Sequence, residues 1–395
     1  MLLLTHKNNS SMLKTYFIYY PLSEGNISEE WEQCFKQINK TILSGYQAVK
    51  LNIFTDLPDY DAFLSFRRII SKSVFNTYKS YCPALNITVH PPEKPWKIAV
   101  EATFILSDSV RISGKKFQDI PYIILESETT KEVWAGGVSS YLYPDDTRRA
   151  AEDAFKLMVA LLEQEQMTLN HLVRQWNYIG DILSVKDGYQ NYQVFNEVRN
   201  DYYRRYRNIK GFPAATGVGM KFGNVVLDFC AVRSDASLKI SPVQNPDQVN
   251  AYNYDQQVLK GVVDKDKSVK HPPQFERALL IVNNHEAFLH ISGTASIIGQ
   301  ATVGLEDIEK QTIVTIENIK KLADKQRISQ YISSPFLYNE KFTLLRVYIK
   351  KQNDFNIVRQ ICEKHFPQVP AIYLEADICR DDLLMEIEAE VDLYS

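Results

Sequence analysis

The stretch PAIYLEA…LLMEIEA, at residues 370–389, is informative about the fold because related stretches occur twice more in the chain. PALNITV…WKIAVEA, at residues 83–102, has the same spacing between its first proline and its last alanine. PAAT…VVLDFCA, at residues 213–231, is a third and more divergent copy. Repetition of one segment at long intervals is typical of a structural unit that has been copied and fused. The sequence therefore predicts three related units.

Hydrophobic patterns predict the same element order in each unit: strand, helix, strand, helix and two closing strands. The third unit shows this order most clearly, with predicted strands at residues 278–282, 288–292 and 342–349, helices at 305–322 and 356–362, and closing strands within 370–391. We place the first unit at residues 12–105, the second at 106–240, and the third, with a long linker, at 241–395.

The composition is that of an ordinary globular protein, because 45% of the 395 residues are hydrophobic and 24% are charged. The formal net charge of −3 gives no reason to expect nucleic acid or a membrane surface as a partner. The apolar run at residues 1–4 is too short for a signal peptide, and no later run approaches the length of a transmembrane helix. We therefore expect a cytoplasmic protein.

The cysteines and glycines indicate chemistry without a metal or a cofactor. The five cysteines are an odd number, and their positions match no zinc-binding spacing. A reducing compartment is the simplest context for them. The glycines form no phosphate-binding loop. We therefore expect free thiols, no metal and no cofactor.

Four segments in a fixed order carry a resemblance to a known family; they are GFPAATGVG at residues 211–219, NP with AYNY within 245–254, ISGTASI at 291–297, and ADICR within 376–388. With the repeated element order, they resemble the Rid superfamily of reactive-intermediate deaminases, small proteins that form trimers. Within it they resemble the chorismatases, in which such units are fused. The resemblance implies an α/β fold of three Rid-like units, each a mixed sheet with two helices on one face. The units would form a pseudo-trimer with a catalytic third unit.

A chorismatase removes the enolpyruvyl group of chorismate and releases pyruvate and a ring acid. Chorismate carries two carboxylates, so its pocket needs cationic or strong hydrogen-bonding groups. The enol ether breaks when its methylene carbon is protonated. A carboxyl group supplies that proton near neutral pH only if burial raises its pKa. The resemblance therefore implies a small-molecule substrate, chorismate, and a buried acid.

Glu386 is the candidate acid, and by resemblance it lies on the family's catalytic glutamate. Strand alternation places Glu386 and Glu388 on one face, with apolar residues on the other. The repeated units distinguish the two glutamates, because Glu388 matches Glu101, whereas Glu386 matches Ala99 and Asp228. The alternative is a solvated glutamate in an edge strand.

Other residues are candidates for binding the substrate. Arg346, on the predicted middle strand of the third unit, suits a carboxylate, and the alternative is a salt bridge to an acid such as Asp354. Tyr254 resembles the Rid active-site tyrosine and could donate to a carboxylate, unless it is a core aromatic residue. Gly293 would let the substrate ring approach the backbone, with Thr294 as a nearby donor; the alternative is a β-bulge glycine.

Cys379 joins Glu386 as a predicted catalytic-site residue because it would shape the outcome of the reaction. A thiol beside Arg380 can be a nucleophile, but no histidine lies near it in sequence, which disfavours covalent catalysis. Chorismatases with cysteine and glycine at the positions of Cys379 and Gly293 resemble the subgroup that forms 3-hydroxybenzoate. We therefore predict a chorismatase that forms 3-hydroxybenzoate and pyruvate.

Several alternatives stay open. The product could be a dihydroxycyclohexadiene carboxylate or 4-hydroxybenzoate. The chain could instead be a Rid-type imine or enamine deaminase, or a ligand-binding protein without activity. Ile372 argues against deamination, because many Rid proteins have an arginine directly after Pro-Ala. A fused pseudo-trimer has little need of partners, so we expect a monomer.

Overall fold

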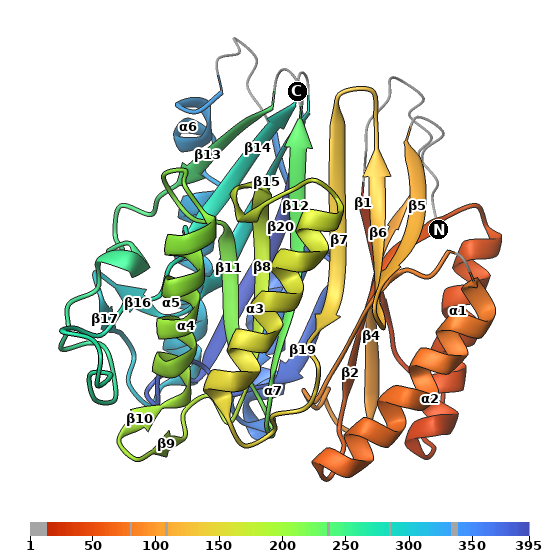
Figure 1. Ribbon diagram of the computed structural model, residues 1–395, viewed down its shortest axis with the longest axis horizontal. Coiled ribbons are helices and arrows are strands. Elements are labelled where there is room, and N and C mark those ends of the chain that lie inside the picture. The colour runs from red at the N-terminus through yellow and green to blue at the C-terminus, as the bar shows by residue number, and fades with distance from the viewer. Residues whose placement is uncertain are drawn as a thin grey trace.

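The computed structural model describes residues 14–79, 81–106, 110–234, 238–283, 286–332 and 339–394. In this part of the chain, three β-sheets follow one another along the sequence, and each carries two long helices (Figure 1). The first sheet has the strand order β1-β4-β2-β3. Its elements are β1 (Lys14–Tyr19), α1 (Ile27–Leu43), β2 (Gln47–Thr55), α2 (Tyr60–Tyr78), β3 (Ala84–Thr88) and β4 (Ile98–Ile105).

The second and third sheets contain this four-strand arrangement and extend it at one edge. The second has the order β11-β8-β12-β7-β6-β5, with β5 (Arg111–Phe117), β6 (Ile120–Glu126), β7 (Thr130–Val138), α3 (Thr147–Gln164), β8 (Leu172–Gly180), α4 (Asn191–Tyr206), β11 (Ala214–Met220) and β12 (Val225–Ser234). The third has the order β13-β14-β15-β20-β18-β19, with β13 (Lys239–Val243), β14 (Ala278–Asn283), β15 (Glu286–Thr294), α5 (Ile308–Leu322), β18 (Asn339–Ile349), α7 (Phe355–His365), β19 (Ala371–Glu375) and β20 (Met385–Tyr394).

Short elements lie between these; they are η1 (Leu169–His171), β9 (Val185–Lys186), β10 (Tyr189–Gln190), η2 (Ala251–Asn253), β16 (Ile297–Ile298), β17 (Ala301–Thr302), α6 (Lys325–Ser329) and η3 (Gln352–Asp354). In every sheet the strand that follows Pro-Ala runs parallel to the middle strand, whereas the last strand runs antiparallel to it. The predicted α/β class with mixed sheets is therefore confirmed.

Strand alternation gives each sheet a helix-facing side and an inner side. On β20, Met385 and Ile387 pack into one core with Ile316 of α5 and Val358 of α7. Glu386 and Glu388, which alternate with these apolar residues, face away from the helices. On the inner sides, the middle strands contribute to a cluster shared by all three sheets, which includes Phe54, Trp176 and Tyr348.

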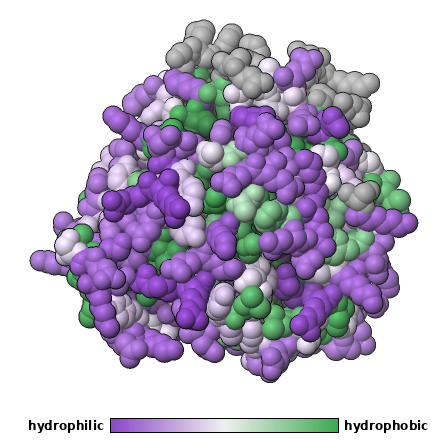
Figure 2. Space-filling view, in the orientation of Figure 1, coloured by the Kyte–Doolittle hydropathy of each residue, from purple (hydrophilic) through white to green (hydrophobic). Residues whose placement is uncertain are grey.

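Each sheet contacts both of the others. Strand β3 lies beside β7, β11 beside β15, and β18 contacts β1. Isolated bridges join Pro92 to Leu374 and Gly219 to Asp377. In Figure 1, α1 and α2 cover the outer side of the first sheet, and α3 and α4 lie in front of the second. The face shown in Figure 2 is mainly hydrophilic, with scattered hydrophobic residues. None of the helices in the described part of the chain has both the length and the apolarity that a membrane crossing needs.

Candidate active site

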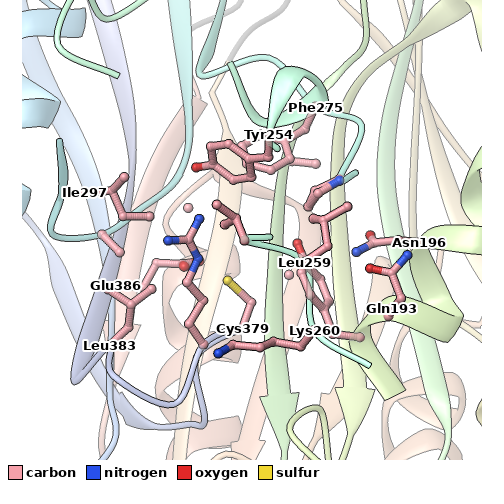
Figure 3. Close-up of a pocket in the computed structure, with 18 of the residues that line it drawn as sticks. Gln193, Asn196, Tyr254, Leu259, Lys260, Phe275, Ile297, Cys379, Leu383 and Glu386 are labelled. Carbon is pink, nitrogen blue, oxygen red and sulfur yellow. The ribbon is translucent and has the colours of Figure 1, made fainter. Parts of the chain in front are cut away.

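A pocket lies between the second and third sheets and is partly covered by the linker that joins them (Figure 3). The second sheet and its helix α4 supply one wall, the linker another, and β15, β16, β20 and the loop before β20 the third. The lining residues are Gln190, Tyr192, Gln193, Asn196, Ala215 and Gly217; Tyr254, Val258, Leu259, Lys260, Pro273 and Phe275; and Arg277, Gly293, Ala295, Ile297, Cys379, Arg380, Leu383 and Glu386.

The Glu386 carboxyl is buried in this pocket without a neutralising partner. The residue is 4% exposed, and its Oε1 has no hydrogen-bond partner among the described residues. Burial is the main cause that raises the pKa of Glu386 to about 8, and the negative charge of Glu388 adds to it. A carboxyl group with this pKa holds its proton at neutral pH, which is the property that a general acid needs.

Gly293 leaves room for this carboxyl group. A β-carbon at position 293 would lie well inside 3.0 Å of the Glu386 Oε1, a separation that real side chains do not show, and 3.0 Å from Thr216 Cγ2. The glycine also sits in a register irregularity between Ile291 and Thr294, so the β-bulge alternative holds as well. Its absent side chain therefore makes space for the acid, where we had expected it to make space for the substrate ring.

Arg277 and Tyr254 form a polar pair at the upper side of the pocket. The Arg277 guanidinium donates to the Tyr254 hydroxyl over 2.6 Å and to the Val249 carbonyl over 2.7 Å. Because the tyrosine oxygen accepts this hydrogen bond, its own proton stays available for an acceptor in the pocket. The Nε of Arg277 is buried and has no partner in the described part of the chain.

Arg380 places a second guanidinium against the same tyrosine. Its Nη1 donates to the Gln300 carbonyl over 2.8 Å, and the group lies 5.0 Å from the centre of the Tyr254 ring. Its buried Nη2 is unpaired within the described residues. Two arginines thus present buried N–H groups without acceptors beside an acid that is itself protonated, which suits a carboxylate ligand.

The prediction that Arg346 binds the substrate carboxylate is wrong. Arg346 lies on the inner side of the third sheet and outside the set of described residues that line the pocket. Its guanidinium pairs with Glu101 of the first unit, over 2.8 Å from Nη2, and with Glu388. The alternative, a salt bridge to an acid, is confirmed, but the acids are Glu101 and Glu388 and not Asp354. Arg346 pairs across the sheet with Glu388, which directs it toward the first unit and away from the pocket.

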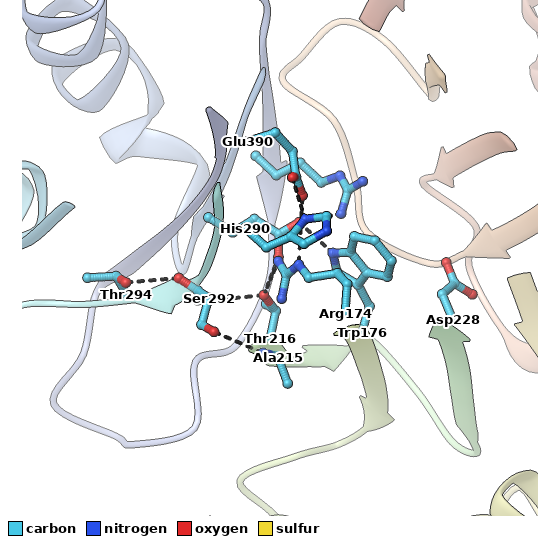
Figure 4. A network of polar contacts seen from close by, with 12 residues as sticks. Arg174, Trp176, Ala215, Thr216, Asp228, His290, Ser292, Thr294 and Glu390 are labelled. Atoms are coloured by element: carbon cyan, nitrogen blue, oxygen red, sulfur yellow. Dashed lines mark hydrogen bonds and ion pairs between the residues drawn. The ribbon is translucent and has the colours of Figure 1, made fainter. Parts of the chain in front are cut away.

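The prediction that Thr294 donates to the substrate is also wrong. Its hydroxyl is buried and donates to the Ser292 carbonyl over 2.8 Å (Figure 4). The Ser292 hydroxyl accepts in turn from the Ala215 N–H over 2.9 Å, which fastens β15 to β11. Gly293 lines the pocket, whereas Thr294 is not among the described residues that line it.

Glu388, the second glutamate of the strand, is held as an anion. It accepts from Arg174 over 2.7 Å, from Trp176 over 2.9 Å, and from Thr216 and Arg346. Burial alone would raise the pKa of Glu388, but the charges of Arg346 and Arg174 outweigh it and the pKa lies below its ordinary value. Figure 4 shows this network where the second and third sheets meet.

Cys379 lines the pocket together with Glu386 (Figure 3). Burial, followed by the negative charge of Glu386, raises the pKa of the Cys379 thiol to about 12. A thiol with this pKa stays protonated near neutral pH, and the protonated form is a poor nucleophile. The geometry is that of a residue that shapes the pocket.

The wall supplied by α4 was missed by sequence reasoning. Asn196 accepts at Oδ1 from Arg199 Nη2 over 2.6 Å, and its buried Nδ2 finds no partner in the described segments. Arg199 is itself buried and forms no ion pair with a described carboxylate. A signal existed, because Gln193, Asn196, Glu197 and Asn200 form a buried polar stripe at helical spacing.

The linker between the second and third units, residues 241–277, covers part of the pocket. Val258 and Leu259 face the pocket, and the following residues are tied to the second unit. Lys267 pairs with Asp201 over 2.6 Å, and Asp264 pairs with Arg148 over 2.6 Å. These links hold the linker against α3 and α4.

Comparison with known proteins agrees with this architecture. The family model described as "Chorismatase FkbO/Hyg5-like, N-terminal" matches residues 127–231. A protein of Streptomyces hygroscopicus named 3-hydroxybenzoate synthase is 30% identical over 256 residues, which are 63% of this chain and 70% of that protein. A chorismatase of Streptomyces rapamycinicus is 29% identical over 225 residues, which are 56% of this chain and 64% of the relative, slightly less than two thirds of its length.

A solved structure shares the fold along nearly the whole chain. The crystal structure of a chorismatase superposes with a TM-score of 0.64 at 20% identity, and the match covers 97% of this chain and 100% of the other. At this identity the likeness speaks for the fold, while the 30% identity to the Streptomyces hygroscopicus protein speaks for descent. The repeated sheets, the family model and these relatives lead to one conclusion: the chain belongs to the chorismatase family.

Proposed function

We propose that this protein is an enzyme that converts chorismate to pyruvate and 3-hydroxybenzoate, with Glu386 as the general acid. One observation carries the proposal: a buried carboxyl group with a pKa of about 8 lines a pocket beside two arginines, each with an N–H group that has no acceptor among the described residues. The relatives named 3-hydroxybenzoate synthase and chorismatase support the same substrate.

The substrate is a dianion, and the pocket offers donors at both of its ends. The enolpyruvyl carboxylate is attached to the carbon next to the methylene that accepts the proton, so it must lie close to Glu386. We assign it to Arg277, Arg380 and the Tyr254 hydroxyl. Figure 3 shows Asn196 on the side of the pocket opposite Glu386. We assign the ring carboxylate to this side, where the unpaired Asn196 Nδ2 and Lys260 can reach it.

The reaction begins when Glu386 transfers its proton to the methylene carbon. The positive charge then develops at the neighbouring carbon, where the ether oxygen and the arginine-bound carboxylate stabilise it. The substrate's own ring hydroxyl oxygen then attacks the ring carbon that carries the ether, the bond from that carbon to the ether oxygen breaks, and its electrons form the carbonyl group of pyruvate. The new carbon–oxygen bridge on the ring opens, its oxygen takes up a proton, and the ring loses a proton to become aromatic. Chorismate has the summed composition of pyruvate and 3-hydroxybenzoate, so no water is consumed overall. The carboxylate of Glu386 regains a proton before the next turnover.

We assign product control to Cys379. Its neutral thiol occupies the ring side of the pocket near Glu386, where its volume limits how water can reach the activated ether. The cysteine and glycine pair favours 3-hydroxybenzoate over the dihydroxycyclohexadiene carboxylate or 4-hydroxybenzoate. The position after Pro-Ala, where many Rid proteins have an arginine, holds Ile372, and this side chain is buried in the shared core. It therefore does not favour imine or enamine deamination.

The test is incubation of the purified protein with chorismate, followed by chromatography of the products and an enzymatic assay for pyruvate. We expect equal amounts of pyruvate and 3-hydroxybenzoate. Glu386→Gln should lower kcat by about 100-fold or more, the usual contribution of a general acid. Arg277→Gln should mainly raise KM. Glu340→Gln, a change at an exposed glutamate of β18, is the matched control and should leave both constants unchanged.

Two results would contradict the proposal. If no pyruvate forms from chorismate, the assigned reaction is wrong, and release of ammonia from 2-aminoacrylate would then identify a deaminase. If Glu386→Gln retains the full rate, the reaction stands but its acid is another group.

We also propose that residues 12–105, 106–240 and 241–395 are fused units arranged as a pseudo-trimer, and that the protein is a cytoplasmic monomer. The four-strand arrangement that the three sheets share and their mutual contacts support this arrangement of units. Light scattering after gel filtration should give the mass of one chain, 45.6 kDa. A mass of two or three chains would refute the monomer.

A further inference from the structure

Two buried carboxyl groups lie side by side on the inner face of β20. Glu386 and Glu388 are two residues apart, so their side chains point to the same face, roughly 6–7 Å apart along the strand. They are 4% and 3% exposed. Two negative charges at this separation in a buried site repel each other strongly, so one group is expected to stay neutral when the other is charged.

The contacts decide which of the two is charged. Both oxygens of Glu388 are occupied, Oε1 by Trp176 and Arg346 and Oε2 by Arg174 and Thr216. Four donors, two of them cationic, fix this group as a carboxylate. By contrast, Oε1 of Glu386 accepts no hydrogen bond from the described residues.

The residues that stabilise the negative charge of Glu388 lie outside the pocket. Arg174 belongs to β8 of the second unit, and Arg346 is fixed by Glu101 of the first unit. His290 and Glu390, which lie further along the same inner face, pair with each other. None of these supporting groups is among the described residues that line the pocket, so a ligand can enter the pocket without disturbing them.

The other charged and titratable groups that face Glu386 are few. The positive charges of Arg277 and Arg174 oppose the effect of Glu388. Arg380 and Lys260 line the same pocket and are also cationic. Cys379 and Tyr192 line the same pocket, and burial raises the pKa of each, so both are neutral near pH 7. Tyr178 and Tyr348, on the inner face near Glu388, have pKa values raised chiefly by burial and are neutral too. Glu388 is thus the anion that bears on the acid.

We propose that Glu388 is a positioning residue for the reaction: it carries a permanent negative charge, anchored by all three units, that keeps the neighbouring Glu386 protonated until substrate binds. This inference rests on the proposed function. The same charge restores the acid after each turnover, because it disfavours the Glu386 carboxylate that proton transfer leaves behind.

The experiment compares the pH titration of Glu386 in four proteins: the wild type, Glu388→Gln, Arg174→Gln and Glu101→Gln. The infrared band of a protonated carboxyl group, taken as the difference between each protein and its Glu386→Gln counterpart, follows Glu386 directly. A charge roughly 6–7 Å away at an effective dielectric constant of about 20 shifts a titration by about one to two pH units. Glu388→Gln should move the midpoint down by that amount.

The other two variants separate a charge effect from general damage. Arg174→Gln should move the midpoint up, because it removes a positive charge near the acid. Glu101→Gln breaks the same buried network, so it is the control for lost stability, and it should move the midpoint by less than about half a unit because its charge is more distant. An upward shift in one variant and a downward shift in another cannot arise from loosened packing.

The pH profile of kcat/KM supplies the second readout. In Glu388→Gln its alkaline limb should move in parallel with the infrared midpoint, which lowers the rate at pH 7 by about fourfold and restores it near pH 5.5. If Glu388→Gln folds poorly, the opposite shift expected for Arg174→Gln still tests the inference. An unchanged Glu386 midpoint in both variants overturns it. The infrared titration needs no turnover. A protein that does not act on chorismate would therefore refute the proposed function, while the effect of Glu388 on the titration of Glu386 could still be measured.

Discussion

Glu386→Gln should stabilise the protein, and the gain should grow as the pH rises. The wild-type carboxyl group has a pKa of about 8 in the folded chain against an ordinary value of 4.5, and it is 4% exposed. A raised pKa in the folded state means that the folded chain holds the proton more tightly than the unfolded chain does. The stability that Glu386 contributes is therefore fully present below pH 4.5, declines as the unfolded chain ionises, and is lost once the pH passes 8.

The magnitude follows from this shift. Each pKa unit corresponds to about 1.4 kcal/mol, so the difference between 8 and 4.5 amounts to about 5 kcal/mol over the full range. Between pH 5 and pH 9 the loss is about 4 kcal/mol. A glutamine has nearly the same shape and does not titrate, so the variant should lack this part of the pH dependence.

The assay is denaturant unfolding of both proteins at pH 5, 7 and 9, followed by tryptophan fluorescence and circular dichroism. We expect the free energy of unfolding of the variant, relative to the wild type, to rise by about 4 kcal/mol from pH 5 to pH 9. Exposed Glu340→Gln should show no such trend. Parallel pH profiles for Glu386→Gln and the wild type would show that the acid is not held neutral, and the reasoning about its role would fail with it.

Three further changes test other parts of the site. Gly293→Ala should leave the protein folded but lower pyruvate release by about 100-fold, because the new methyl group occupies the space of the Glu386 carboxyl; a near-normal rate would contradict the contact. Arg346→Met should lower the free energy of unfolding by about 3–5 kcal/mol, because Glu101 loses its buried partner; a higher KM without lost stability would instead restore its role as substrate binder. Cys379→Ala should shift the products, separated by chromatography, toward the dihydroxycyclohexadiene carboxylate, and an unchanged ratio would remove Cys379 from product control.

The fold was predictable because its signals are local and repeated. The Pro-Ala stretches and the strand alternation around Glu386 follow from a two-residue period that the chain shows three times. The candidate acid was found by comparing the copies, because Glu386 is matched by Ala99 in the first unit and by Asp228 in the second. Gly293 and Tyr254 line the same pocket as Glu386, although the contacts of the glycine differ from those expected.

The remaining parts of the site depend on contacts between units, which a sequence does not display. The inward direction of Arg346 follows from strand alternation. Only the assembled sheets show that its guanidinium pairs with Glu101 of another unit. Arg277 precedes a strand and Arg380 sits in a loop, positions without a periodic signal. The α4 wall belongs to a different unit from the acid, so its polar stripe has no visible partner until the second and third sheets are placed together.

The corresponding positions in the other two units differ from Glu386. At the position that sequence comparison assigns to the acid, the first unit has Ala99, which carries no carboxyl group. The second has Asp228, which accepts from the Gly137 N–H over 2.8 Å, much as Glu386 lies against a glycine. However, Asp228 is also paired with the buried Lys50 over 2.7 Å.

A general acid needs an unpaired carboxyl group and an adjacent space for substrate. Lys50 lies at ion-pair distance from Asp228, so this side chain serves as one member of a buried ion pair. A pocket between the first and second units is lined by Arg67 and Tyr141, with the guanidinium 3.9 Å from the centre of the tyrosine ring, but Asp228 is not among its described lining residues. By contrast, Glu386 lines a pocket, and its Oε1 has no hydrogen-bond partner among the described residues. Of the carboxyl groups compared, that of Glu386 therefore meets both needs.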